Sequence, residues 1–140
     1  MSAEENKGVD RRLIEEGLNQ RNLAIYDEFS ASNIVNHTPT GTIQGTEAYK
    51  QYLSAYITAF PDLRFTIESQ LADGDFSAVH WTARGTHQGM LAGIPATGKS
   101  ATTPGVTLLR RANGKVVESW IYFDNLALLQ QLGVIPTLLG

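Results

Sequence analysis

Apolar residues in the first half of the chain recur with helical spacing, most clearly between Thr46 and Pro61. Thr46 is a plausible N-cap, and Pro61 disfavours helical geometry at the residue before it, so we expect a helix between them. A weaker apolar stripe between Val9 and Leu18 predicts an earlier helix, and residues 23–29 predict a short second one. The apolar positions of the clearest helix follow the spacing i, i+3, i+4, i+7, i+8 and i+11, and they are Tyr49, Tyr52, Leu53, Tyr56, Ile57 and Phe60.

The apolar spacing changes to two after Pro61, which predicts strands. The hairpin signals Asp73-Gly74 and Asn113-Gly114 join neighbouring strands in an antiparallel arrangement. In the first expected strand Leu63, Phe65, Ile67 and Leu71 alternate with polar residues, which is typical of a half-buried strand. The four strands are expected at about residues 63–71, 76–87, 100–111 and 115–124.

Three further segments complete the predicted layout. Residues 30–45 are rich in Ser, Thr, Asn, Gly and Pro, so we expect them to be mostly loop. Pro104-Gly105, inside the third expected strand, predicts a bulge or a position at the sheet edge. A short helix over residues 126–132 ends at Gly133. This order predicts an α+β fold, in which a strongly curved, mainly antiparallel sheet wraps over N-terminal helices and leaves a pocket between them.

Composition narrows the class of protein. The 140 residues fit one domain, which we place at residues 1–140. The net charge of −3, without a basic block, argues against a nucleic-acid partner. Cysteine is absent, which excludes a disulfide framework, a thiolate nucleophile and a cysteine-ligated metal. No apolar run is long enough for a membrane span and the acidic start is unlike a signal peptide, so we expect a cytoplasmic protein without a membrane partner.

Strand alternation sorts the two histidines of the second expected strand. His87 has the same parity as Trp81, whereas His80 lies on the opposite face. We therefore expect His80 to be exposed or at an interface. His87 is expected on the apolar face, either as an acid–base group or as a strand-end histidine bonded to backbone.

Asp124 differs from the other carboxylates because it ends an aromatic strand, in phase with Trp120 and Tyr122. A carboxylate kept dry beside aromatic rings has a raised pKa and suits general acid–base catalysis. Aspartate also favours helix N-cap positions, and a helix is expected to begin near Leu126. Spacing alone leaves both roles open.

Other chemical motifs are weak. The histidines lack the spacing of a zinc site, so no metal is expected. Residues 93–100 have the glycine spacing of a phosphate loop, but a strand follows them instead of a helix. The chain has no Gly-x-Ser-x-Gly elbow, which argues against a serine hydrolase.

Five separated motifs resemble, in order, the SnoaL-like polyketide cyclases, also called predicted ester cyclases. The similarity runs from about Val9 to Pro136. It implies a nuclear-transport-factor-2-like (NTF2-like) fold, a cone of helices on a curved sheet, and a homodimer or homotetramer packed through that sheet. The motifs are Ala-Phe-Pro-Asp-Leu at 59–63, Gly-Thr-His-Gln-Gly at 85–89, Gly-Ile-Pro-Ala-Thr-Gly-Lys at 93–99, Gly-Lys-Val-Val-Glu-Ser-Trp at 114–120 with Asp124 beyond it, and Gln-Leu-Gly at 131–133.

The resemblance also implies a chemistry. The characterised cyclases close a ring by intramolecular aldol condensation without cofactor or metal, and Asp124 matches their catalytic aspartate. We expect Asp124 to act as the general base on a small apolar or aromatic, polyketide-like carbonyl ligand. His87 would donate a hydrogen bond to the carbonyl oxygen or protonate it. The predicted pocket residues are His37, Trp81, Trp120, Tyr122, Tyr56 and Phe60.

Two departures from the family pattern keep other functions open. Thr38 stands where many relatives have an acidic residue, and Ala96 replaces a frequent second proline. One alternative is a hydrolase, isomerase or dehydratase that uses the same pocket. The other is a non-catalytic domain for hydrophobic-ligand binding or assembly, because a fold alone does not determine a function.

Overall fold

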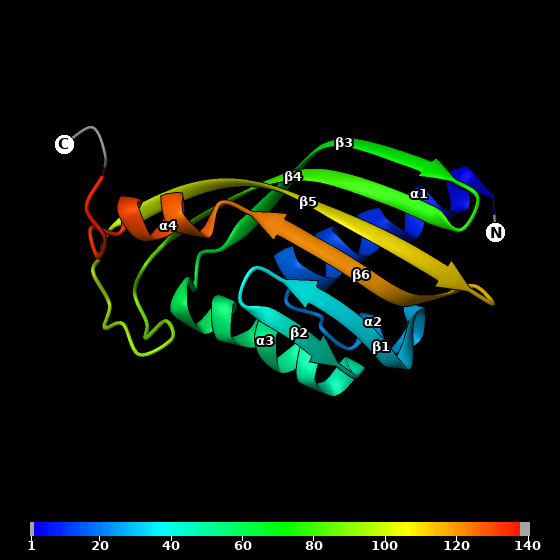
Figure 1. Cartoon of the computed structure of the whole chain (residues 1–140), viewed down its shortest axis with the longest axis horizontal. Coiled ribbons are helices and arrows are strands. Elements are labelled where there is room, and N and C mark those ends of the chain that lie inside the picture. Colours follow the sequence, from blue (N-terminus) through cyan, green and yellow to red (C-terminus); the bar gives the residue numbers. More distant parts are fainter. Residues whose placement is uncertain (1, 138–140) are drawn as a thin grey trace.

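The computed structural model describes residues 2–137, in which a curved sheet of six strands lies against a group of helices (Figure 1). The strands follow the order β2-β1-β6-β5-β4-β3 across the sheet. The helices are α1 (Ala3–Arg12), the π-helix η1 (Leu13–Asn19), α2 (Ile25–Phe29), α3 (Thr46–Ala59) and α4 (Asn125–Gln131). The strands are β1 (Ser30–Thr38), β2 (Gly41–Gln44), β3 (Arg64–Asp73), β4 (Phe76–Thr86), β5 (Ser100–Ala112) and β6 (Lys115–Phe123).

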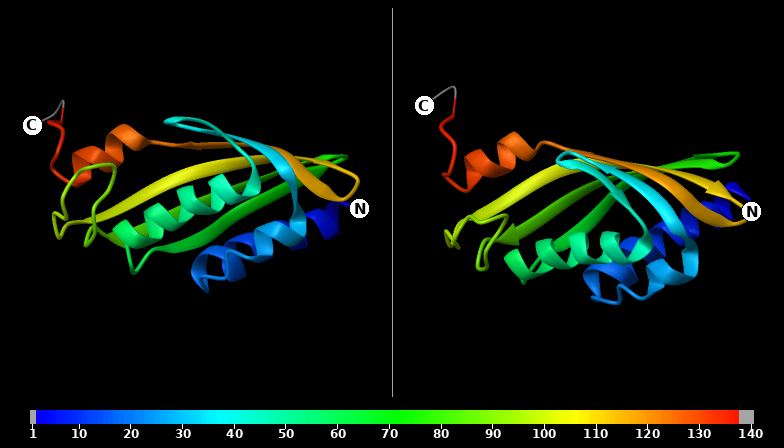
Figure 2. Two further views of the ribbon diagram at one scale, coloured as in Figure 1. Left: turned by 90° about the horizontal axis from the view of Figure 1, so that it is seen from below. Right: turned by 60° about the horizontal axis from the view of Figure 1, so that its bottom comes forward.

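The helices α1, α2 and α3 gather on the hollow side of the sheet, while most of its other side stays bare (Figure 2). We call these the inner and outer faces. The short helix α4 lies at the end of the sheet opposite the N-terminus (Figure 1). This arrangement confirms the predicted α+β cone of helices on a curved sheet. None of the helices in the described residues is long and apolar enough to cross a membrane.

Local sequence explains how α1 begins and which side it buries. Ser2 and Glu5 form a capping box, in which the Ser2 side chain accepts from the Glu5 amide and the Glu5 carboxylate accepts from the Ser2 amide. Asp10, Leu13 and Ile14 are buried, at the helical spacing i, i+3 and i+4. The first helix therefore places the Asp10 carboxylate in the protein interior.

The strands β3 to β6 pair in antiparallel order, and alternation along them separates the two faces. On β6, Ser119 and Ile121 are buried, whereas Tyr122 is 62% exposed. Gly105 on β5 lies under the indole of Trp81, because a Cβ placed there would come within 2.3 Å of that ring. Glycine is thus required at position 105 for Trp81 to lie flat on the sheet.

The largest difference from the sequence prediction is the segment 30–45, which forms β1 and β2 instead of loop. β1 pairs with β2 in antiparallel order and with β6 in parallel order, so its backbone bonds are met on both sides. Its short polar residues have low strand propensity, and tertiary pairing overrides that propensity. The sheet is accordingly mainly antiparallel with one parallel pair.

Three local predictions are also corrected. A register shift between Ile67 and Ser69 turns Leu71 outward, where it is 73% exposed. Pro104 is neither at a bulge nor at an edge, because β5 lies between β4 and β6 and Pro104 pairs with Thr82. The N-cap of α3 is Gly45, and Thr46 is its first helical residue.

Candidate active site

A cavity lies between the inner face of the sheet and the helices α1, η1 and α3. The space open to the centre of a water molecule is about 130 Å³. One water needs only about 10–15 Å³ by that measure, so the cavity has room for a small organic ligand. Its wall is mostly apolar and includes Leu13, Ile14, Leu18, Ile34, Leu53, Phe65, Val79, Leu109, Val116, Ile121 and Phe123.

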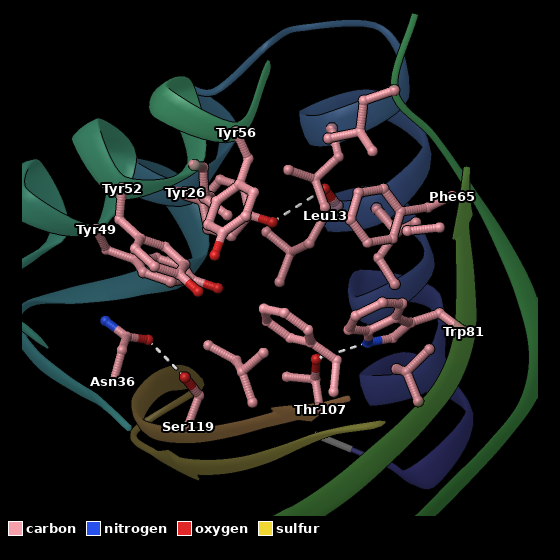
Figure 3. Close-up of a pocket in the computed structure, with 18 of the residues that line it drawn as sticks. Leu13, Tyr26, Asn36, Tyr49, Tyr52, Tyr56, Phe65, Trp81, Thr107 and Ser119 are labelled. Atoms are coloured by element: carbon pink, nitrogen blue, oxygen red, sulfur yellow. Dashed lines mark hydrogen bonds between the residues drawn. The ribbon is translucent and has the colours of Figure 1, made fainter. Parts of the chain in front are cut away.

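Three tyrosines of α3 supply the hydroxyl groups of one wall. Tyr49, Tyr52 and Tyr56 extend from this helix toward the sheet (Figure 3). Burial raises the pKa of all three phenols above the ordinary value. They therefore stay neutral at physiological pH and serve as hydrogen-bond donors, which suits the oxygen of a carbonyl group.

Two polar pairs face these tyrosines from the sheet (Figure 3). The hydroxyl of Ser119 donates to Oδ1 of Asn36 at 2.5 Å, and the Nδ2 of Asn36 is buried without a partner. The indole nitrogen of Trp81 donates to Oγ1 of Thr107 at 3.0 Å. The Nδ2 of Asn36 is therefore a polar atom whose hydrogen-bonding capacity is unmet.

Asp10 is the carboxylate of the cavity wall, and its exposed fraction is 1%. It forms a buried ion pair with Arg111 of β5. Burial raises the pKa of Asp10, although the Ser77 hydroxyl and the Arg111 charge oppose that change. No other Asp or Glu, and no His, contributes to this wall within the described part of the chain.

The structure brings three of the predicted site residues together at the cavity. Tyr56 and Phe60 reach it from the end of α3, and Trp81 reaches it from β4. The aromatic residues of α3 therefore contribute both to the hydrophobic core and to the cavity wall.

Asp124 lies outside the cavity wall, in an exposed position at the start of α4. Its Oδ1 accepts a hydrogen bond from the amide of Ala127 at 2.9 Å. Of the two roles that spacing left open, the N-cap is the one observed. The expected burial against Trp120 and Tyr122 is wrong, because Tyr122 itself is largely exposed.

His87 is completely buried, but it does not contribute to the cavity wall. Its ring packs against Phe60, with ring centroids 5.4 Å apart. Its Nδ1 accepts from the amide of Thr97 at 3.2 Å, which leaves the proton of a neutral ring on Nε2. His87 thus anchors the loop that follows β4, and its Nε2 has no partner.

His37, Trp120 and Tyr122 lie on the outer face. The Nε2 of His37 contacts Oε2 of Glu118 at 2.8 Å, and its ring stacks on Trp120 with centroids 5.5 Å apart. These three predicted pocket residues are therefore separated from the cavity by the sheet, which corrects the prediction. His80 is exposed, as the strand alternation predicts.

Sequence reasoning overlooked two buried polar residues of the wall, Asp10 and Asn36. A signal for Asp10 was available, because it lies three and four residues before Leu13 and Ile14 and so shares their helical face. The sequence gives no such signal for Asn36, because the composition of its segment predicts loop.

The candidate site holds no cluster suited to a metal ion. Among residues 2–137, no group of three or more His, Cys, Asp or Glu side chains lies close enough to hold one.

Comparison with known proteins gives a family and a fold. The family model of the SnoaL-like polyketide cyclase matches residues 9–132. AclR from Streptomyces galilaeus, a proposed hydroxylase, is 28% identical, with a TM-score of 0.85 over 96% of this chain and 100% of its own. IdmH from Streptomyces antibioticus, a proposed polyketide cyclase, is 29% identical, with a TM-score of 0.79 over 91% of this chain and 98% of its own.

A third structure, a proposed SnoaL-like polyketide cyclase from Jannaschia sp. CCS1, shares the fold. It is 24% identical, with a TM-score of 0.86 over 96% of this chain and 95% of its own. No curated protein sequence matches the chain. AclR and IdmH are described by different reactions, so similarity to them does not determine the reaction of this chain.

Proposed function

The chain belongs to the SnoaL-like polyketide cyclase family, and from that premise we propose that its cavity binds a small apolar carbonyl compound. We further propose cofactor-independent acid–base chemistry on that compound, of the kind that closes a ring by intramolecular aldol condensation. The observation that carries this proposal is the group of phenols on α3, kept neutral by burial, in a cavity whose wall is mostly apolar.

The proposed chemistry begins with loss of a proton from a carbon next to the ligand carbonyl. The resulting enolate carries negative charge on the carbonyl oxygen, and donors already in position stabilise that charge without reorganising. The phenols of Tyr52 and Tyr56 are donors of this kind in the cavity wall (Figure 3). A flat aromatic ring in the ligand would spread the charge further and would suit the apolar wall.

The proton acceptor requires a carboxylate that is kept dry. An ordinary aspartate has a pKa of about 4, which is far below that of a simple ketone. A positioned general base typically contributes about 10²–10⁴-fold to the rate. The catalytic roles predicted for Asp124 and His87 stay predictions, and their positions outside the cavity wall argue against them.

Binding of 2-tetralone, a bicyclic aryl ketone, tests the ligand class. Isothermal titration calorimetry should detect it, and the Tyr52→Phe/Tyr56→Phe double variant should bind it about 5–10-fold more weakly, because a hydrogen bond contributes about 1 kcal/mol. Tetralin, which lacks the oxygen, is the matched control ligand and should bind both proteins equally. A wild-type protein that binds neither compound contradicts the proposal.

Non-catalytic ligand binding is the second candidate, and one observation favours it. Within residues 2–137 the cavity wall contains no histidine, the commonest acid–base group of enzymes. Tight binding of 2-tetralone without any exchange of its carbon-bound protons would support this alternative.

We also propose that the chain assembles through the outer face of its sheet. Val106 and Tyr122 are cross-strand neighbours on that face, and they are 40% and 62% exposed. Exposed apolar neighbours of this kind favour association. Sedimentation equilibrium should show a homodimer or homotetramer that Tyr122→Asp weakens, and a monomeric wild-type protein would contradict the proposal.

A further inference from the structure

A buried polar cluster that the proposed function has not yet used lies beside the cavity wall. Asp10 of α1 meets Arg111 of β5 and Ser77 of β4 there, and each is less than 5% exposed. Of these three residues, Asp10 is the one that contributes to the cavity wall.

The contacts of Asp10 commit only one of its two oxygens. Arg111 donates from Nη2 to Oδ1 of Asp10 and from Nη1 to the hydroxyl of Ser77, the latter at 2.8 Å. The backbone amide of Arg111 is held by the carbonyl of Asp75 at 2.8 Å. The Oδ2 of Asp10 is buried and accepts no hydrogen bond. An unmet carboxylate oxygen in an apolar wall is costly, unless a ligand group meets it.

The groups around the Asp10 carboxylate determine its electrostatic environment. Arg111 is the charged group that faces it, and Ser77 and Tyr26 are its neutral polar neighbours. The negative charge of Asp10 contributes to the raised pKa of Tyr26, so this phenol stays protonated. Arg111 and Ser77 thus fix the orientation of the carboxylate, and Oδ2 is its oxygen without a hydrogen-bond partner.

We propose that Oδ2 of Asp10 is the proton acceptor of the cavity, an inference that rests on the proposed function. The bond between hydrogen and the carbon next to the ligand carbonyl breaks, and the proton passes to Oδ2. The electron pair moves into the new carbon–carbon double bond, and the carbonyl oxygen becomes the enolate oxygen. In a cyclisation the enolate carbon then bonds to a second carbonyl carbon, whose oxygen takes up the proton from Asp10.

Three differences favour Asp10 over Asp124 as this acceptor. Asp10 contributes to the cavity wall, whereas Asp124 does not. Asp10 is 1% exposed, whereas Asp124 lies in solvent. The oxygen without a partner is buried in Asp10, whereas the Asp124 side chain caps α4 in an exposed position.

Hydrogen–deuterium exchange at the α-carbons of 2-tetralone in D₂O tests the proposal, with ¹H NMR as the readout. Wild-type protein should accelerate the exchange, and Asp10→Asn should reduce that acceleration by about 10²–10⁴-fold. The exchange should also slow as the solution becomes more acidic, because protonated Asp10 accepts no proton. Glu118→Gln is the matched control, since it makes the same carboxylate-to-amide change beside an arginine on the outer face.

Asp10→Asn leaves Arg111 buried without its partner, so we expect the variant to lose stability. The Asp10→Asn/Arg111→Met double variant removes that charge, and circular dichroism and 2-tetralone binding verify that it is folded. Loss of exchange with binding retained supports the proposal. Exchange that survives in the folded double variant, or that Asp124→Asn abolishes instead, overturns Asp10 as the acceptor while the proposed ligand class stands. Failure of the wild-type protein to bind 2-tetralone overturns the proposed function itself.

Discussion

Two neighbouring arginines of β5 form ion pairs on opposite faces of the same sheet. Arg111 is directed inward to Asp10, and their side chains are 3% and 1% exposed. Arg110 is directed outward to Glu118, and their side chains are 39% and 25% exposed. The register shift between Arg110 and Arg111 lies at this point of the strand.

The comparison shows how environment changes the chemistry of the same residue types. Burial raises the pKa of Asp10, whereas contacts with His37 and Arg110 lower the pKa of Glu118. The outer carboxylate is satisfied by two partners, but the inner one retains an unmet oxygen. Only the inner pair therefore combines a dry environment with a free proton acceptor.

Breaking the inner pair should produce the largest effect on stability. Asp10→Asn leaves a buried guanidinium without its counter-charge, which should cost about 3–5 kcal/mol in the free energy of unfolding. Glu118→Gln, in its solvated position, should leave the urea midpoint almost unchanged. Equal losses in urea denaturation would contradict the distinction between the two faces.

Crowding the inner face should have the second largest effect. Gly105→Ala places a methyl group within 2.3 Å of the Trp81 indole, so the ring must move, at a cost of about 1–3 kcal/mol. Gly8→Ala is the control, because no atom lies within 4 Å of its Cβ and it should stabilise α1 by about 0.5–1 kcal/mol. Thermal unfolding measures both changes, and an unaffected Gly105→Ala protein would refute the close contact.

Asp124→Ala distinguishes the two roles considered for this residue, the N-cap of α4 and the general base. Loss of the N-cap of α4 should cost about 1 kcal/mol in the free energy of unfolding. The α-proton exchange of 2-tetralone should continue at the wild-type rate, because Asp124 lies outside the cavity wall. If the variant kept its stability but no longer accelerated α-proton exchange in 2-tetralone, Asp124 would be the base after all.

The smallest effect is the opposite pH response of the two carboxylates. Between the ordinary pKa of Asp10 and its raised value the folded state binds more protons, so stability falls as pH rises through that window. The contribution of Glu118 is present above its ordinary pKa and is lost as pH falls through the lowered value. Carboxyl ¹³C NMR titration should give a pKa above the ordinary value for Asp10 and a pKa below it for Glu118. Two pKa values displaced in the same direction would contradict the comparison.

Sequence periodicity predicted most of this architecture but little of the site. The alternation around Trp81 assigned the side chains of β4 to the correct faces of the sheet, because that strand has no register shift with its partner β5. The same rule failed for Leu71, because a bulge, invisible to periodicity, reverses the faces. It was also unable to choose a face for Trp120, since both faces of β6 carry apolar residues.

The polar site was hidden for a different reason. Asp10 and Arg111 are separated by 101 residues, and their meeting depends on how α1 lies across the sheet. Neither residue belongs to a motif that the resemblance covers. Asn36 lies in a strand whose composition predicts loop, so its inward direction follows only from the pairing of β1 with β6.

The emission of the two tryptophans tests most directly whether the inner face is the ligand site. Trp81 lies in the cavity wall and Trp120 lies on the outer face, so each single-tryptophan variant reports on one side of the sheet. Titration with 2-tetralone should quench Trp81 in the Trp120→Phe variant. It should leave Trp120 unquenched in the Trp81→Phe variant at the same ligand concentrations. Quenching of Trp120 alone would place the ligand on the outer face and contradict the account.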